Sequence, residues 1–172
     1  RLVAEAGATV VAVSRSRDNL DTHVGPLVDQ GLSVLPVVAD AATDAGIATV
    51  LDEACRAGGM FYGLVNVAGG AAPQTWMPAT RVTRADWREL FTANLETMFF
   101  MSQAVAAEIR ARGNAGSIVS VSSISGMNTA PYHIAYGTAK AAIVAATRTM
   151  AAELAADGIR VNAVAPGVTE TA

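Results

Sequence analysis

Short apolar runs rich in valine alternate along the chain with longer segments of helical periodicity. The apolar runs predict buried parallel strands at 8–14, 32–38, 63–67, 117–121 and 160–164. The helical patterns lie at 18–30, 43–57, 83–112 and 136–156, and residues 1–6 read as the last turns of another helix. Strands that alternate with helices need crossover connections. The pattern therefore predicts an α/β fold, a Rossmann-type doubly wound parallel sheet with helices on both faces.

Polar and glycine-rich residues collect where the predicted strands end. They are Ser14-Arg15, Asp40, the segment 66–70, Ser122-Ser123 and Pro166-Gly167. Ligands of open parallel sheets bind at the carboxyl ends of the strands. The sequence thus predicts a ligand site at this edge of the sheet.

Composition limits the class of protein. With 172 residues, 52% of them hydrophobic and 16% charged, the chain can form one packed domain over 1–172. The net charge of −3 gives no reason to expect nucleic acid or an anionic membrane as a partner. No run reaches the roughly 18 apolar residues of a membrane span. The single cysteine, Cys55, allows no internal disulfide and suits the cytoplasm, and no metal site is expected because His133 has no histidine or cysteine near it.

The chemistry of the chain centres on a tyrosine and the only lysine. Lys140 follows Tyr136 by four residues, which places both on one face of a helix. An ammonium beside a phenol favours the phenolate, so the pair suits proton transfer to a carbonyl oxygen or from an alcohol. A surface lysine beside a core tyrosine has the same spacing. The functional interpretation is favoured because the sole lysine falls here and a strand ending in serines lies just upstream.

Several motifs in order resemble those of the short-chain dehydrogenase/reductase family over essentially the whole chain. Asn66-Val-Ala-Gly69 is similar to its Asn-Asn-Ala-Gly motif, and Asn94 matches its helix asparagine. Ser123 lies thirteen residues before Tyr136, and Tyr136-Gly-Thr-Ala-Lys140 matches the catalytic pair. The segment from Arg160 to Gly167 resembles the loop beside the nicotinamide.

This resemblance implies an oxidoreductase that interconverts a carbonyl and a secondary alcohol. Tyr136 would be the acid/base, Lys140 would support it and bind the nicotinamide ribose, and Ser123 would polarise the substrate carbonyl. Asn94 would hold a water that links Lys140 to solvent. Structural alternatives remain: Ser123 as the cap of a strand end among several serines, Asn94 as a satisfied helix residue, and Asn66 as the residue that closes a turn.

The resemblance also implies which residues bind the cofactor. They are Ser14, Arg15, Asp40, Asn66, Ala68, Gly69, Tyr136, Lys140, Pro166, Gly167, Thr169 and Thr171. Arg15 stands where an acidic side chain would reject a 2′-phosphate, and arginine forks suit phosphate oxygens. NADP(H) is therefore expected over NAD(H), with an exposed arginine at a strand end as the alternative.

Segments that the family places at both ends are not in the sequence. Its glycine-rich pyrophosphate turn and first strand are expected before Arg1, and its last strand and substrate lid after Ala172. Without them, residues 1–172 alone are expected neither to bind cofactor well nor to unfold as a robust two-state unit. The missing first strand would lie between the strands at 8–14 and 63–67, so a gap between these two strands, or a sheet with altered pairing, is expected.

Other classes of function make different predictions. A non-catalytic nucleotide-binding protein of the same fold would be expected to lose one of Ser123, Tyr136, Lys140 and Asn94. A flavodoxin-like signalling domain would need a different pattern of carboxylates at its strand ends, and it has no use for the pair of Tyr136 and Lys140. The residues leave the direction of reaction open, and the substrate open among 3-oxoacyl thioesters, secondary alcohols, sugars and steroids. The long alanine-rich helix predicted at 136–156 favours a homodimer or homotetramer.

Overall fold

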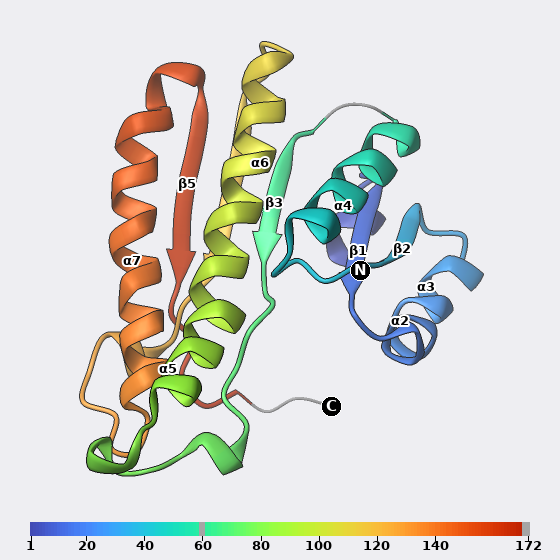
Figure 1. Ribbon diagram of the computed structural model, residues 1–172. Helices are drawn as coiled ribbons and strands as arrows, with labels where there is room; N and C mark the ends of the chain where they lie inside the picture. The colour runs from blue at the N-terminus through green and yellow to red at the C-terminus, as the bar shows by residue number, and fades with distance from the viewer. Residues whose placement is uncertain (59–60, 170–172) are drawn as a thin grey trace. The chain divides into compact units, whose positions relative to one another are not determined.

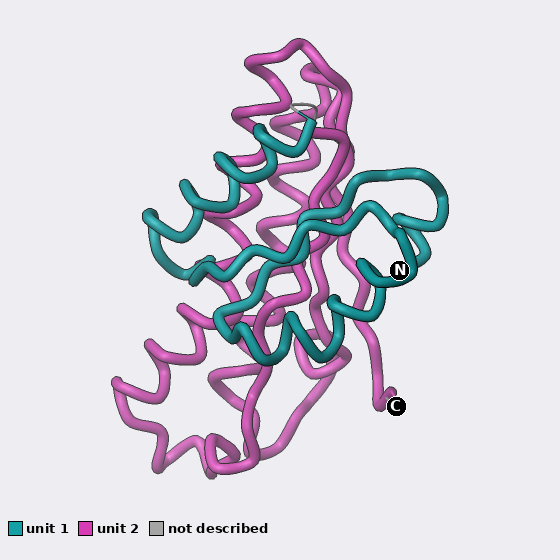
Figure 2. Tube along the Cα trace, turned by 90° about the vertical axis from the view of Figure 1, so that its right-hand side faces the viewer, with its two compact units in different colours: residues 1–60 teal, residues 61–172 magenta. Residues whose placement is uncertain are grey.

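The computed structural model describes residues 1–58 and 61–169, which form two compact units, 1–60 and 61–172 (Figure 2). All five predicted strands occur, with bounds within two residues of those expected. The predicted single domain over 1–172 stays a prediction. Thr171, one of the predicted cofactor contacts, lies outside the described residues.

The first unit is built on two parallel strands. Its elements are α1 (Leu2–Glu5), β1 (Val10–Ser14), α2 (Arg17–His23), α3 (Gly25–Asp29), β2 (Val34–Val38) and α4 (Asp44–Ala57). β1 pairs with β2 from Val10 opposite Val34 to Ser14 opposite Val38. Thr43 caps α4 by accepting a hydrogen bond from the Gly46 amide.

The helix predicted at 18–30 is two helices, so this expectation was wrong. α2 ends at His23 and α3 begins at Gly25, with Val24 between them. Pro26 has no amide hydrogen, and it disfavours helical backbone at the residue before it. The helical pattern continues past this point, but the backbone hydrogen-bond ladder does not.

The second unit is built on three parallel strands in the order β3–β4–β5. They are β3 (Gly63–Asn66), β4 (Gly116–Val121) and β5 (Ile159–Val164), followed in register by Asn66 opposite Ser120. Helices α6 (Thr97–Ala111) and α7 (Ile134–Leu154) cover one face of this sheet (Figure 1). Four fully buried isoleucines fill the interface between the sheet and these helices: Ile109, Ile118, Ile143 and Ile159.

The long helix predicted at 83–112 is interrupted at a point that its sequence pattern does not indicate. It consists of α5 (Arg84–Phe91), a π-helical turn (Thr92–Glu96) and α6. Thr83 and Asp86 form a capping box at its start, which agrees with the predicted start of the helix at 83. α7 begins two residues before the expected Tyr136 and is followed by a 3-10 turn (Ala155–Asp157) that Gly158 ends in a left-handed conformation. Three more 3-10 turns complete the unit: Pro73–Thr75, Ala79–Arg81 and Ile124–Gly126.

Among the described residues β1 pairs with β2, and β4 pairs with both β3 and β5. The expected gap or altered pairing between the strands at 8–14 and 63–67 stays a prediction. Parallel strands flanked by helices confirm the α/β class. Within the described part of the chain, no helix is long and apolar enough to cross a membrane, and no cluster of potential metal ligands occurs.

Candidate active site

Tyr136 and Lys140 lie on one face of α7, as their spacing predicted. The Lys140 ammonium nitrogen is 5.6 Å from the centroid of the Tyr136 ring. It donates a 2.8 Å hydrogen bond to the Val121 carbonyl at the end of β4, and the residue is only 3% exposed. Burial lowers the pKa of Lys140 below its ordinary value, because desolvation disfavours the charged form. A lysine buried this far is uncommon without a role that offsets its desolvation.

The start of α7 is fixed against the segment after β4 by contacts that sequence reasoning missed. The Ser122 hydroxyl donates a 2.7 Å hydrogen bond to the Lys140 carbonyl. A side-chain carbon on Gly126 would lie 2.6 Å from the Ala141 nitrogen, and one on Gly137 would lie 2.8 Å from the Ser125 carbonyl oxygen. The two glycines therefore allow the turn after β4 and the start of α7 to lie close together. This close approach sets the position of Lys140 relative to the end of β4.

The serines around the end of β4 have different partners. Ser120 accepts a hydrogen bond from the Asn66 amide, and Ser122 bonds α7. The Ser123 hydroxyl accepts a local hydrogen bond from the Ser125 amide at 3.1 Å, and among the described residues its proton has no acceptor. Of these three hydroxyls, that of Ser123 is thus the one without a hydrogen bond to another helix or strand. Ser123 is also the serine that the sequence predicted to contact the substrate.

Asn94 holds the loop after β3. It sits in the π-helical turn with no exposed surface. Its side-chain nitrogen donates to the Leu90 and Gly70 carbonyls, both at 2.9 Å, and its oxygen accepts from the Gly70 amide at 2.8 Å. The two bonds to Gly70 form a clamp on this residue, and they are the structural alternative considered above, a helix asparagine whose polar groups all have partners. Because both amide hydrogens of Asn94 are used, a water could bind Asn94 only at an oxygen.

The contact between Gly69 and Asn94 makes a sharp prediction. Gly69 has a φ of 132°, and an added side-chain carbon would lie 2.5 Å from the Asn94 side-chain oxygen. Gly69→Ala is expected to lower the free energy of unfolding by about 1–3 kcal/mol more than Gly70→Ala, measured by urea denaturation. Gly70 is the matched control, because its φ of 139° is similar but nothing lies within 4 Å of the added carbon. Equal losses in the two variants would show that backbone conformation, not the clamp, sets the requirement.

Asn66 lies inside the second unit rather than in a turn. Its amide nitrogen donates to the Ser102 hydroxyl of α6 at 2.9 Å and to the Ser120 hydroxyl of β4 at 3.1 Å. The side chain therefore joins β3, β4 and α6. Sequence reasoning missed Ser102, although a serine at buried helical spacing among Met98, Met101 and Val105 was a visible signal.

A small cavity opens beside Tyr136. The loop after β3 and the residues just before Tyr136 contribute Ala71, Thr75, Trp76, Tyr132 and His133 to its wall. Helix α5 and the residues just before it also line the cavity, with Val82, Asp86 and Leu90, and no sequence signal singled them out. The cavity therefore draws on three segments that are far apart in the chain.

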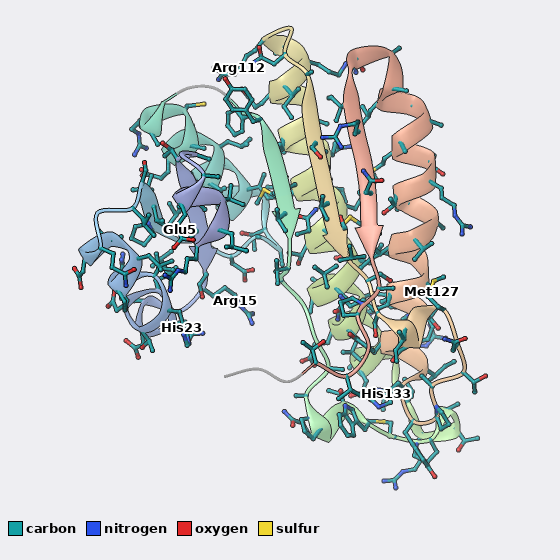
Figure 3. The ribbon with its side chains drawn as sticks, turned by 180° about the vertical axis from the view of Figure 1, so that it is seen from behind. Glu5, Arg15, His23, Arg112, Met127 and His133 are labelled. Atoms are coloured by element: carbon teal, nitrogen blue, oxygen red, sulfur yellow. The ribbon has the colours of Figure 1, made fainter. Side chains whose placement is uncertain are left out.

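Aromatic and backbone contacts join the loop at 71–77 to the start of α7. The Trp76 and His133 rings are 4.7 Å apart, and the Met77 amide donates to the Tyr132 carbonyl at 3.0 Å. Tyr132 has a φ of 67°, a strained conformation for a residue with a side chain. His133, labelled in Figure 3, buries an Nδ1 atom that has no hydrogen-bond partner among the described residues.

The loop after β5 runs beside the turn that follows Ser123. The Ile124 amide donates to the Pro166 carbonyl at 3.0 Å, and the Thr169 hydroxyl to the Gly167 carbonyl at 3.3 Å. Apolar side chains are exposed along these two segments: Ile124, Met127 (Figure 3) and Val168. These apolar side chains are therefore accessible to a ligand.

The predicted adenosine contacts lie in the first unit. The Ser14 hydroxyl accepts a hydrogen bond from the Ser16 amide at 3.2 Å, and an Asp40 carboxylate oxygen accepts one from the Ala42 amide at 3.0 Å. Arg15 is exposed at the end of β1 (Figure 3) and forms no ion pair within the described residues. Its guanidinium is thus available to an anion.

Comparison with known proteins identifies the family. The model of the short chain dehydrogenase family matches residues 1–172. The chain is 36% identical over 170 residues to 3-oxoacyl-(acyl-carrier-protein) reductase FabG of Thermotoga maritima, which covers 99% of this chain and 68% of that protein. The chain therefore belongs to the short-chain dehydrogenase/reductase family, a family of oxidoreductases.

Solved structures show the same Rossmann-type fold. A gluconate 5-dehydrogenase from Burkholderia cenocepacia in complex with NADP and tartrate superposes with a TM-score of 0.87 at 32% identity, covering 98% of this chain and 65% of its own. An NAD⁺-bound xylitol dehydrogenase gives a TM-score of 0.91 at 28% identity, covering 99% and 64%. The chain thus spans 64–68% of the length of these three relatives.

Proposed function

We propose that the protein containing this chain is a nicotinamide-dependent oxidoreductase that interconverts a carbonyl and a secondary alcohol. The observation that carries the proposal is the buried Lys140, whose ammonium lies 5.6 Å from the Tyr136 ring beside a cavity that Tyr136 lines. A buried ammonium attracts the negative charge that develops on the Tyr136 oxygen as its proton is transferred, and this attraction is stronger away from water.

The residues of the site have distinct proposed roles. In the reducing direction, Tyr136 donates its phenolic proton to the carbonyl oxygen as that oxygen gains charge. Ser123 donates its free hydroxyl proton to the same oxygen and orients it. Lys140 stabilises the phenolate that remains, and a water held at an Asn94 oxygen returns a proton from solvent. The nicotinamide, when bound, supplies the hydride in this direction and accepts it in the other.

The chain offers contacts for both ends of the cofactor. We propose that Asn66, Ala68, Gly69, Tyr136, Lys140, Pro166, Gly167, Thr169 and Thr171 serve the nicotinamide half, and that Ser14, Arg15 and Asp40 serve the adenosine half. The exposed apolar side chains of Ile124, Met127 and Val168 are available for contact with the nicotinamide ring. Among the relatives, one structure holds NADP and another NAD⁺, so the family position alone leaves the choice open. The unpaired guanidinium of Arg15 favours NADP(H).

Replacing Arg15 with Asp tests this preference. We expect the variant to lose at least about tenfold in kcat/KM for NADPH, because a charge-assisted bond contributes about 1.5–3 kcal/mol. The value for NADH should stay within a few-fold. Steady-state kinetics with both cofactors measure the ratio, and Arg17→Asp is a nearby control with the same change of charge. An unchanged ratio of the two cofactors in the Arg15 variant would refute the assignment.

Transfer of deuterium tests the proposed activity directly. The full-length protein is incubated with NADPH or NADH deuterated at the reactive carbon and with 3-oxoacyl thioesters, keto sugars and simple ketones. Mass spectrometry should find deuterium in the alcohol product of at least one substrate. Cofactor binding without transfer to any of them would favour the non-catalytic alternative.

We expect the protein in the cytoplasm, because its single cysteine needs no oxidising compartment.

We also propose that the full-length protein is a homodimer or homotetramer. α7 exposes small side chains at Ala141, Ala145 and Ala152, and α6 exposes Phe100 at 45%. Light scattering at micromolar concentration should therefore report a multiple of the protomer mass. Ala145→Arg should shift the protein toward the monomer, whereas Ala48→Arg on α4 should not. A wild-type monomer would contradict this proposal.

A further inference from the structure

A broad second hollow adjoins the cavity beside Tyr136. It is lined by Val82, Thr83, Arg84, Trp87, Arg88 and Ile134. Val82 and Ile134 also line the first cavity. The two hollows therefore share a wall, and a ligand that reaches Tyr136 could extend over these two apolar side chains toward α5.

The two arginines of this hollow lie at positions where the local electrostatics disfavour a positive charge. Arg84 and Arg88 are one helical turn apart on α5, and like charges at this spacing repel. Arg84 is also the first residue of the helix, where the macrodipole disfavours a cation. Neither forms an ion pair with any part of the chain that the structure describes. Both costs would be reversed by an anion bound between the two guanidinium groups.

Asp86, a carboxylate of α5, does not serve as that anion. Asp86 accepts hydrogen bonds from the Thr83 amide at 2.9 Å and the Thr83 hydroxyl at 2.6 Å. These bonds lower the pKa of the Asp86 carboxyl and commit it to the capping box. Asp86 lines the first cavity and not the second, so none of the described residues that line the arginine-containing hollow is a carboxylate.

We propose that the substrate carries a carboxylate or phosphate group remote from its reacting carbonyl, and that Arg84 and Arg88 bind it. The middle of the substrate would lie against Val82 and Ile134, with Trp87 as an aromatic wall. Guanidinium forks match both kinds of oxyanion. The role of Tyr136 at the other end rests on the proposed function, whereas the anion site rests on the geometry of α5 alone.

Matched ketones test the specificity in the full-length enzyme. Methyl ketones ending in a carboxylate, from levulinate upward in chain length, are each compared with their methyl ester and with the corresponding phosphate monoester. We expect one chain length at which an anion has a kcat/KM at least about tenfold above its neutral ester. In the Arg84→Gln/Arg88→Gln variant this advantage should disappear, mainly through KM, while the ester changes less than about twofold. The better of the two anions identifies the group.

Arg81→Gln is the control for a general effect of charge. Arg81 precedes the same helix but does not line the hollow, so its loss should change the anion's advantage less than about twofold. An equal loss in the Arg81 variant, or no preference for any anion in the wild type, would overturn the proposal.

Tryptophan fluorescence gives a readout independent of activity. The chain contains two tryptophans, Trp76 and Trp87, so Trp76→Phe leaves Trp87 to report on the hollow. The same ketocarboxylates should change the Trp87 emission at lower concentration than their esters, and the double arginine variant should remove the difference. If no ketone is reduced but this binding persists, the proposed function fails and the anion site stands. A response to polyglutamate alone, with none to the small anions, would assign the arginines to an acidic protein partner and overturn the proposal.

Discussion

Replacing Tyr136 with Phe is expected to lower kcat for carbonyl reduction by about 100- to 10,000-fold, the usual contribution of a general acid. Only the phenolic oxygen is lost, and the ring keeps its place on α7 near the Lys140 ammonium. Cofactor binding should change only slightly, because Lys140 and the loops at the strand ends remain. The measurements are steady-state kinetics of the full-length enzyme and cofactor titration by fluorescence.

Tyr62→Phe is the matched control for the Tyr136 variant. Tyr62 is 69% exposed and does not line the cavity beside Tyr136, so loss of its hydroxyl should leave kcat near that of the wild type. Wild-type turnover in the Tyr136 variant would end the assignment of the acid/base. A loss of cofactor binding as large as the loss of kcat would instead point to a role in binding.

Replacing Lys140 with Met should separate activity from stability. We expect kcat/KM to fall at least about 100-fold, because the variant loses the charge that favours the phenolate. The free energy of unfolding at neutral pH should stay the same or rise. Methionine fills a similar volume without the desolvation of a buried ammonium, and the lost hydrogen bond to the Val121 carbonyl offsets this by only about 1 kcal/mol.

The difference in stability between the wild type and the Lys140→Met variant should change with pH in one direction. Burial lowers the pKa of Lys140 in the folded state, so the unfolded chain binds more protons between that pKa and the ordinary value of 10.5. The stability of the wild type relative to the Met variant should therefore rise as pH increases through this window. Urea unfolding of both proteins from neutral to alkaline pH measures the difference, in which other groups cancel. A difference independent of pH would show that Lys140 is no less basic in the fold than in the unfolded chain.

Much of the fold followed from local pattern. The five strands appear where valine-rich runs predicted them, because a buried parallel strand needs continuous apolar residues whatever its neighbours are. The helices at 43–57 and 136–156 are also close to expectation. The exceptions are local as well: Pro26 divides one predicted helix, and the π-helical turn at Thr92–Glu96 interrupts another without a distinctive residue type.

The candidate site divides in the same way. Tyr136 and Lys140 share a helix face because four residues make about one turn, so their relation was fixed by spacing. Spacing did not determine which serine near the end of β4 lacks a hydrogen bond to another element. That depends on Asn66 of β3 and Lys140 of α7, which are the partners of the other two serines. The same holds for Asn94, whose clamp on Gly70 joins segments 24 residues apart.

By itself, the sequence determined the α/β class and the pair of Tyr136 and Lys140, because both are carried by residue types at short and regular separations. It also determined the membership of an oxidoreductase family, which is carried by several short motifs in a fixed order along the chain. Only the tertiary structure decided the rest. It brought α5 beside the start of α7, so that Arg84 and Arg88 line a hollow next to the cavity at Tyr136. It also buried Lys140 against Val121 and thereby lowered the lysine pKa. Such relations arise from the packing of distant segments and the exclusion of water between them, which no periodicity along one segment records.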